Sequence, residues 1–343
     1  MTTRQTAGNR TATEIRLASR PVGTPVPADF AFTEVDLPEL AEGQILVRNT
    51  WMSVDPYQRE RMRLDVAWAP PYEVGEAVDG PALGEVVESR APAIPVGSTV
   101  VHFLGWRDLA VVDAAAATPV DPDLASPTDL MGPLGTTGLT AYIALTEIAP
   151  VKEGDVVFIS AAAGAVGSIA GQLARRFGAS TVIGSAGGPA KGEKIVERFG
   201  YDAAVDYKAG DLRGQLAAAA PEGIDVYIDN VGGEHLEAGL DALRHRGKAA
   251  IVGNVSGYNE TGTPTGPSNY FDIAAKELTV RGVLVGHHFG AWADYISEAS
   301  QWLAEGSLAS EATVVDGLEK APDAFIGMLK GENVGKMLVR LGE

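Results

Sequence analysis

The run from Phe158 to Gly178, FISAAAGAVGSIAGQLARRFG, is apolar, passes through a series of small residues and then resumes at helical spacing. Gly164 and Gly167 have the spacing of the second and third glycines of the motif G-x-G-x-x-G, and Ala162 stands at the position of the first. A strand-turn-helix unit with this motif brings backbone N–H groups and a helix N-terminus to a dinucleotide pyrophosphate. The alternative for the loop alone is a tight connection whose small residues serve packing.

The turn after the next predicted strand indicates which dinucleotide would bind. Enzymes that use NAD usually carry an acidic residue there, about 20 residues after the glycine-rich turn, to bind the adenosine 2′-hydroxyl. This chain has SAGGPAK at 185–191, with small residues and a lysine but no acid. Small residues leave room for a 2′-phosphate and Lys191 can neutralise it, so we predict NADP(H). Lys194 is the alternative cation, and a solvated lysine without a ligand is the other interpretation of Lys191.

Alternating strand and helix patterns surround this turn and must position it. Crossovers of this length predict an α/β fold, a Rossmann-type, doubly wound parallel sheet of six strands in the order 3-2-1-4-5-6. The expected strands are 156–160, 181–184, 203–206, 225–229, 249–253 and 278–285. The expected helices are 167–177, 193–199, 211–220, 234–243 and 292–305.

The sequence pattern of the rest of the chain predicts a second, β-rich domain. Short alternating runs bounded by Gly, Pro and Asp occur at 43–56, 81–89, 96–106 and 108–113. The tail adds two strand patterns, 313–315 and 336–340, around a short helix at 322–330, and we expect these strands to return to the N-terminal domain. The predicted division is a discontinuous β-rich domain, 1–133 with 307–343, and a dinucleotide-binding domain, 134–306.

Composition excludes several classes of function. The formal net charge of −18 argues against nucleic acid as a partner, because phosphate binding needs clustered Lys and Arg. No apolar stretch is long enough to span a membrane, and the polar N-terminus lacks the apolar region of a secretory signal, so we expect a cytoplasmic protein. The absence of cysteine removes disulfides, thiolate nucleophiles and cysteine-ligated zinc.

Metal and serine-hydrolase chemistry are not expected either. The five histidines are scattered along the chain, and the adjacent pair His287 and His288 would point to opposite faces of a strand. The sequence has no G-x-S-x-G nucleophile elbow.

Motifs along almost the whole chain resemble the zinc-independent branch of the medium-chain dehydrogenase/reductase superfamily. This branch contains leukotriene B4 dehydrogenase/prostaglandin reductases, alkenal double-bond reductases and bacterial curcumin reductase. The motifs include WMSVDPYQRERM (51–62), LGTTGLTAY (134–142), DYK (206–208), DNVGGE (229–234), GNVSGYN (253–259) and GENVGK (331–336), together with the two turns described above. The resemblance implies that the β-rich part is a GroES-like catalytic domain beside the NADP-binding one.

The resemblance also implies cofactor positions, most of them at the carboxyl ends of predicted parallel strands, where such sheets bind ligands. Those at the pyrophosphate and adenosine end are Gly164, Ala165, Val166, Gly167, Lys191 and Tyr207. Those beside the rest of the cofactor are Asn230, Val252, Gly253, Asn254, Ser256, Tyr258, Val283, Leu284, Val285 and Asn333, the last of which returns from the tail.

The implied reaction is the NADPH-dependent reduction of the C=C bond of an α,β-unsaturated ketone or aldehyde. Hydride at the β-carbon generates an enolate, whose oxygen needs a hydrogen-bond donor. Tyr258 is the candidate catalytic donor; the alternative is that it only orients the cofactor. Tyr57 and Tyr270 are weaker candidates for a pocket that takes a small hydrophobic enone or enal.

Two further questions are the function and the oligomeric state. A quinone oxidoreductase and a non-catalytic NADPH-binding sensor are the rival functions. Members of this family are commonly dimeric, and the apolar sixth strand, TVRGVLVG, would pair across a two-fold axis at the edge of the sheet, so we expect a homodimer.

Overall fold

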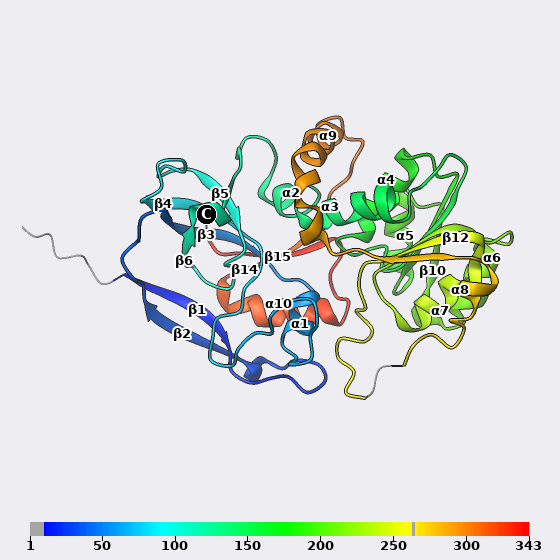
Figure 1. The fold of residues 1–343 in the computed structure, drawn as a ribbon, viewed down its shortest axis with the longest axis horizontal. Helices are drawn as coiled ribbons and strands as arrows, with labels where there is room; N and C mark the ends of the chain where they lie inside the picture. Colours follow the sequence, from blue (N-terminus) through cyan, green and yellow to red (C-terminus); the bar gives the residue numbers. More distant parts are fainter. Residues whose placement is uncertain (1–9, 263–264, 343) are drawn as a thin grey trace, which may run out of the picture. The chain divides into compact units, whose positions relative to one another are not determined.

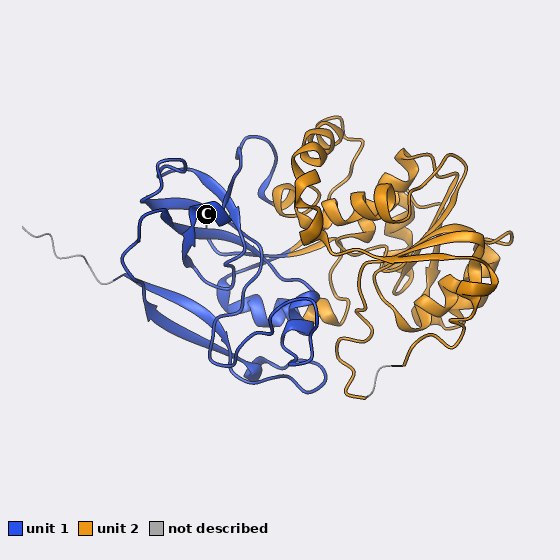
Figure 2. Cartoon of the chain, viewed as in Figure 1, with its two compact units in different colours: residues 1–127, 314–326, 338–343 blue, residues 128–313, 327–337 orange. Residues whose placement is uncertain are grey.

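The computed structural model describes residues 10–262 and 265–342, which form two compact units (Figure 2). The β-rich unit comprises residues 1–127, 314–326 and 338–343. The parallel-sheet unit comprises residues 128–313 and 327–337. The chain therefore passes between the units several times, as expected for a discontinuous domain.

The boundaries of the units differ from the predicted division at 133/134 and 306/307. Residues 128–133, 307–313 and 327–337 group with the parallel sheet instead of the β-rich unit. The reason for the last segment is local bonding: the N–H of Gly335 donates to the carbonyl of Ala163, 2.8 Å away, beside the glycine-containing turn. The prediction assigns the whole tail, 307–343, to the β-rich domain. In the structure, residues 327–337, which lead into the final strand, belong with the parallel-sheet unit.

The parallel-sheet unit is built on six strands in the order β10-β9-β8-β11-β12-β13, which confirms the predicted order 3-2-1-4-5-6. All five strand pairings are parallel. The strands are β8 (Val156–Ile159), β9 (Thr181–Ala186), β10 (Ala203–Asp206), β11 (Ile224–Asp229), β12 (Leu243–Ile251) and β13 (Thr279–Gly282). β12 begins six residues before the predicted 249, and β13 ends before the predicted 285.

Helices cover both faces of this sheet, as the doubly wound topology requires. α4 (Gly167–Arg176) packs on β8 and β9 and against α3 (Thr136–Ile143), which continues as a π turn, Ala144–Ile148, and also contacts α9 (Trp292–Ala304). α6 (Leu212–Ala219) and α7 (Gly233–Ala242) pack together, and α5 (Pro189–Arg198) packs on β9 and β10 (Figure 1). α2 (Pro127–Met131) and α8 (Asp272–Ala275) are short.

The core of the unit lies between the sheet and these helices. Phe158 of β8 and Tyr227 of β11 are fully buried and stack with ring centroids 5.1 Å apart. Consecutive residues of the central strands, such as Val157, Phe158 and Ile159 of β8, are apolar and buried, which is typical of a parallel sheet covered by helices on both faces.

The β-rich unit carries an antiparallel sheet. Its path is β14-β15-β3-β4-β5-β7, with β6 paired to β3, and a separate pair is formed by β1 and β2. The bounds are β1 (Thr11–Leu17), β2 (Phe30–Asp36), β3 (Gln44–Ser53), β4 (Ala82–Ser89), β5 (Thr99–His102), β6 (Leu109–Asp113), β7 (Thr118–Pro119), β14 (Ala312–Asp316) and β15 (Lys336–Arg340). The tail strand β15 pairs antiparallel with β3, with Leu338 opposite Ser53. The helices of this part are α1 (Tyr57–Arg61) and α10 (Ala321–Leu329).

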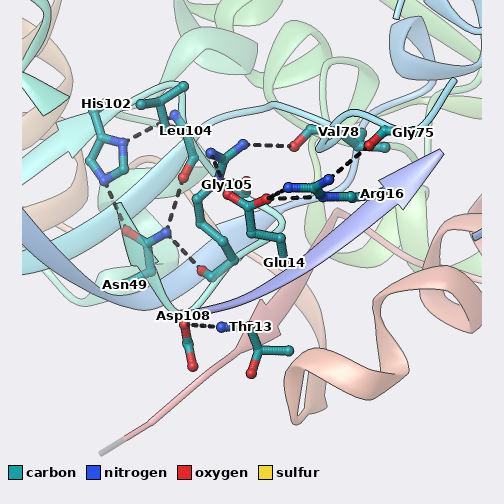
Figure 3. A network of polar contacts seen from close by, with 11 residues as sticks. Thr13, Glu14, Arg16, Asn49, Gly75, Val78, His102, Leu104, Gly105 and Asp108 are labelled. Atoms are coloured by element: carbon teal, nitrogen blue, oxygen red, sulfur yellow. Dashed lines mark hydrogen bonds and ion pairs between the residues drawn. The ribbon is translucent and has the colours of Figure 1, made fainter. Parts of the chain in front are cut away.

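A buried polar network fixes the loop after β5 (Figure 3). Nδ1 of His102 accepts the N–H of Leu104 at 3.1 Å, so the ring proton lies on Nε2, which donates to Oδ1 of Asn49 at 2.9 Å. The amide of Asn49 donates in turn to the carbonyls of Leu104 and Arg107. Burial holds the pKa of His102 down at about 4, and the charge of Arg107 adds to this shift. The network therefore requires a neutral imidazole.

No helix within the described residues is long and apolar enough to cross a membrane.

Candidate cofactor site

The turn after β8 is tight, and its left-handed residue is Ala161, one position before Ala162. Ala161 has a φ of +49°, a left-handed conformation, and its carbonyl accepts the N–H of Gly164 at 2.9 Å. Ala162 instead donates its N–H to the carbonyl of Ser185 on β9 at 2.8 Å. Ala162 is the second residue of this four-residue turn, and the left-handed conformation falls one residue earlier, on Ala161.

Gly167 is required by the packing of this turn. A Cβ at Gly167 would lie 2.3 Å from the carbonyl oxygen of Ala161, whereas one at Gly164 would meet the same oxygen at 3.2 Å and nothing else within 4 Å. Gly167 therefore allows α4 to approach the turn closely, and Gly164 leaves an open surface above it. These are the roles that the glycine spacing predicts.

The N-terminus of α4 presents donors to this open surface. Within the described residues, the backbone N–H groups of Ala165, Val166 and Gly167 have no hydrogen-bond acceptor. Unpaired N–H groups at the start of a ten-residue helix form a favourable site for an anion. The donor set fits a pyrophosphate, and it contains three of the four residues predicted for that contact.

The tail loop that precedes β15 lies against the same turn. Gly335 and Gly164 form a parallel bridge. The side-chain amide of Asn333 donates to the carbonyl of Gly335, 2.8 Å away, which folds the loop onto itself. The structure therefore brings the loop that carries Asn333 to the glycine-containing turn, although the two are far apart in sequence.

The two candidate lysines on α5 have different partners. The ammonium of Lys191 donates to the carbonyl oxygens of Gly331 and Asn333, each 2.6 Å away. Lys194 forms an ion pair with Glu311, and Arg198 shares that carboxylate. Because Lys194 already pairs with a carboxylate, whereas Lys191 bonds only to uncharged carbonyls, Lys191 is the better candidate for an anionic ligand.

The turn that contains Lys191 is fastened to the turn after β10. Gly188 has a φ of +91° and donates its N–H to Oδ1 of Asp206 at 2.8 Å, and the same oxygen accepts the N–H of Lys208 at 2.9 Å. Asp206 thus ties the turns after β9 and β10 together. Burial lowers the pKa of Lys191, and the nearby positive charge of Lys208 lowers it further.

Tyr207 and Lys208 lie beside Gly187 in this turn. A Cβ at Gly187 would be 2.7 Å from the hydroxyl of Tyr207 and 3.0 Å from Cε of Lys208. The Tyr207 ring packs edge-on against His235, whose Nε2 contacts the hydroxyl of Ser185 at 2.7 Å. Within the described residues the ammonium of Lys208 has no partner. Lys208 is not among the predicted cofactor residues, although it is the next residue after Tyr207 in the DYK motif.

The end of β11 is a buried hydrogen-bonded corner. Asn230 donates its backbone N–H to the hydroxyl of Ser160 and its side-chain amide to the carbonyl of the same residue, at 2.8 and 2.7 Å. Oδ1 of Asp229 accepts bonds from Ser160, Tyr227, Val231 and Gly232, while its Oδ2 is buried without a partner in the described part of the chain. Asp229, which was not predicted, therefore shapes the turn that carries Asn230.

The segment after β12 holds the predicted donor. The N–H of Asn254 donates to the phenolic oxygen of Tyr258 at 3.3 Å, and Tyr258 is only 9% exposed. The side chain of Asn254 occupies the space that a Cβ at Gly232 or Gly257 would fill, at 2.1 and 2.4 Å. The hydroxyl of Ser256 donates to the carbonyl of Val231 at 2.7 Å. Asn254 and Ser256 thus use their side chains to hold this segment on the turn before α7.

The remaining predicted cofactor positions lie directly after the ends of β12 and β13. Val252 and Gly253 both donate N–H bonds to the carbonyl of Asp229, so they lie beside the end of β11. Val283 donates to the carbonyl of Ile251, and Leu284 and Val285 continue from the edge strand β13 into a 3-10 turn. All of these positions follow the carboxyl ends of strands in one unit.

The two weaker pocket candidates are not brought together within one unit. Tyr57 belongs to the β-rich unit, where it packs edge-on against Trp68 at 5.8 Å. Burial raises the pKa of Tyr57 well above its usual range, and the nearby carboxylates of Asp55 and Asp79 add to the shift. Tyr270 belongs to the parallel-sheet unit and is 68% exposed. Trp68 is a further aromatic neighbour that sequence reasoning did not single out.

A six-stranded parallel sheet in this order, with a glycine-containing turn after its first strand, defines the class of Rossmann-type dinucleotide-binding folds. Two family profiles match the chain: one described as the N-terminal domain of oxidoreductase at residues 13–120, and one described as zinc-binding dehydrogenase at residues 165–305. The described residues bring together no group of three or more His, Cys, Asp or Glu side chains that could hold a metal ion.

Individual relatives match over almost the whole chain. The chain is 36% identical to the NADPH-dependent curcumin reductase of Escherichia coli over 330 residues, 95% of each chain, and 38% identical to mouse prostaglandin reductase 1 over 324 residues, 93% of this chain and 95% of that one. It superposes on the crystal structure of CurA from Vibrio vulnificus in complex with NADPH with a TM-score of 0.92 at 36% identity, covering 96% of this chain and 99% of that one. The chain belongs to the medium-chain dehydrogenase/reductase superfamily, in the group of prostaglandin and curcumin reductases.

The predicted family and fold are thereby confirmed. The cofactor predicted from the sequence, NADP(H), is the one named for the Escherichia coli and Vibrio vulnificus relatives.

Proposed function

We propose that this protein uses NADPH to reduce the C=C bond of α,β-unsaturated ketones or aldehydes. The observation that supports NADPH as the cofactor is the acid-free turn after β9, in which Lys191 is held at the start of α5. The full-length similarity to an NADPH-dependent curcumin reductase and to prostaglandin reductase 1 supports the class of reaction.

The residues of the parallel-sheet unit fit such a cofactor. The N–H groups of Ala165, Val166 and Gly167 would bind the pyrophosphate. Lys191 and Lys208 would bind the 2′-phosphate, because a dianion is best matched by more than one cation. The positions beside the remainder of the cofactor would be Tyr207, Asn230, Val252, Gly253, Asn254, Ser256, Tyr258, Val283, Leu284, Val285 and Asn333.

When bound, NADPH supplies a hydride. Addition at the β-carbon of an enone moves negative charge to the carbonyl oxygen, and the protein must stabilise that charge. Tyr258 is suited to this role, because the N–H of Asn254 points at its phenolic oxygen, which fixes the ring and polarises the O–H bond toward donation. Solvent would protonate the α-carbon. The roles of Tyr57 and Tyr270 in substrate binding stay predictions.

A substrate panel tests the proposal. Enals, enones, 15-keto lipids, curcumin and 1,4-benzoquinone are assayed by the loss of NADPH and NADH absorbance. The proposal expects turnover of enones or enals, with NADPH preferred at least about tenfold, a difference that needs only about 1.4 kcal/mol. Faster reduction of benzoquinone would make the protein a quinone oxidoreductase. NADPH binding without turnover of any compound would make it a sensor.

The protein would act as a homodimer. β13 is the last strand of the parallel sheet, and in the described residues its outer edge pairs with no other strand. An open edge of this kind is a site for strand pairing with a second copy. Sedimentation velocity tests this, and a monomer at micromolar concentration would contradict it.

A further inference from the structure

Lys191 lies in the first turn of α5, and its side chain bonds to a distant segment of the chain. Its ammonium lies 2.6 Å from the carbonyl oxygens of both Gly331 and Asn333. These partners are 140 and 142 residues away in sequence and belong to the loop before β15. Lys191 therefore joins α5 to the tail loop.

The other end of the tail loop is fastened separately. The N–H of Gly335 donates to the carbonyl of Ala163 at 2.8 Å, and Val334 donates to the hydroxyl of Thr313 at 3.0 Å. Residues 331–335 thus run from the lysine to the pyrophosphate turn. The loop connects the two places where the phosphate groups of a bound dinucleotide would lie.

The chemistry of the ammonium decides what this link can do. A lysine ammonium has three N–H donors and no acceptor. Two donors satisfy the carbonyls, so a third can serve an anion without breaking either bond. Carbonyls carry no formal charge, and Lys208 adds a second positive charge nearby. Neither carbonyl bond therefore neutralises Lys191, although the carboxylate of Asp206, which accepts the N–H groups of Gly188 and Lys208, lies in the same pair of turns.

We propose that the amino group of Lys191 holds the Gly331–Asn333 loop and binds the 2′-phosphate at the same time. We call this shared contact the Lys191 tie. On this basis, which rests on the proposed use of NADPH, a 2′-phosphorylated nucleotide tightens the tail loop, and an ordered tail loop strengthens binding of the 2′-phosphate. The two effects are reciprocal because they share one free energy of coupling. Cofactor choice would then be linked to the placement of Asn333.

Amide hydrogen exchange of the intact protein tests the tie without measuring activity. The reporters are the N–H groups of Val334 and Gly335, both bonded in the structure. Without any ligand, Lys191→Ala is expected to exchange at these amides at least about tenfold faster than the wild type, equivalent to about 1.4 kcal/mol. Lys152→Ala, at an exposed lysine before β8, is the matched control and should leave them unchanged.

A ligand experiment then separates the two proposals. In the wild type, 2′,5′-ADP should slow exchange at Val334 and Gly335 more than 5′-AMP does, and Lys191→Ala should abolish that difference. Lys191→Arg, which keeps several donors, should restore protection in the ligand-free protein. Unchanged exchange in ligand-free Lys191→Ala would overturn the tie, whatever the cofactor. Failure of 2′,5′-ADP to bind by calorimetry would overturn the NADPH proposal, while the ligand-free comparison would still decide the tie.

Discussion

The phenolic oxygen of Tyr258 accepts a hydrogen bond from the backbone N–H of Asn254, 3.3 Å away. The bond joins two residues that are four positions apart in the segment after β12. It therefore fixes the aromatic ring to the backbone at the carboxyl end of the parallel sheet. It makes Tyr258 a positioned hydroxyl rather than a mobile one. A hydroxyl held in this way can donate to a developing oxyanion without first being ordered.

Replacing Tyr258 with Phe should lower kcat/KM for an enone by about a hundredfold, the usual cost of removing one donor to a developing oxyanion. The dissociation constant for NADPH should change little, because the ring and its packing remain. Tyr142→Phe, at a tyrosine of α3 outside the proposed site, is the control. Unchanged kcat with weakened NADPH binding would show that Tyr258 only orients the cofactor.

Replacing Lys191 with Ala should abolish the preference for NADPH over NADH. Lys194→Ala should retain the preference, because Lys194 is paired with Glu311. Steady-state KM values for both cofactors measure this. Loss of preference in Lys194→Ala and retention in Lys191→Ala would reverse the assignment.

Replacing Lys208 with Ala should weaken NADPH binding about two- to fivefold and leave NADH binding unchanged. The effect is small because Lys208 is exposed and interactions of exposed charges are worth roughly 0.2–1 kcal/mol. Binding titrations at low and high salt measure it, and the wild-type advantage should shrink as salt rises. An equal loss of NADH affinity would remove Lys208 from the 2′-phosphate site.

Two glycines of the cofactor turn should respond differently to alanine. Gly167→Ala places a Cβ 2.3 Å from the carbonyl oxygen of Ala161, so we expect it to destabilise the fold by about 1–3 kcal/mol, as overpacking does. Gly164→Ala meets the same oxygen at 3.2 Å, so it should fold but bind NADPH less tightly, because its methyl group projects into the cradle. Denaturant unfolding and binding titrations compare them. Equal stability of the two variants would contradict the close approach of α4.

The stability of the β-rich unit should fall in acid because of His102. Its pKa is lowered from 6.5 to about 4 in the folded protein, so the unfolded chain binds more protons between these values. The stability that the buried neutral His102 contributes is complete above pH 6.5 and is lost as the pH falls toward 4. At most about 3 kcal/mol is involved. Unfolding free energies of the wild type and His102→Gln should show a smaller loss over this range in the variant, and parallel curves would contradict the assignment.

Local sequence patterns predicted the strands and helices of the parallel sheet to within a few residues, with the exceptions at β12 and β13. Strand order followed as well, since crossovers of this length have one favoured hand. The family resemblance supplied most of the candidate site. The β1–β2 pair was not predicted, and Lys208 and Asp229 were missed, because their importance depends on neighbours from other strands.

The sequence by itself determined the fold class, the glycine-containing turn and the acid-free segment that favours NADP(H), since each depends on residue types close together in the chain. Tertiary structure decided the rest. It placed the left-handed turn at Ala161, paired Lys194 with Glu311 and joined Lys191 to Gly331 and Asn333. The two lysine contacts depend on segments more than 100 residues apart, whose meeting is set by the packing of the whole sheet and leaves no periodic signal in the chain.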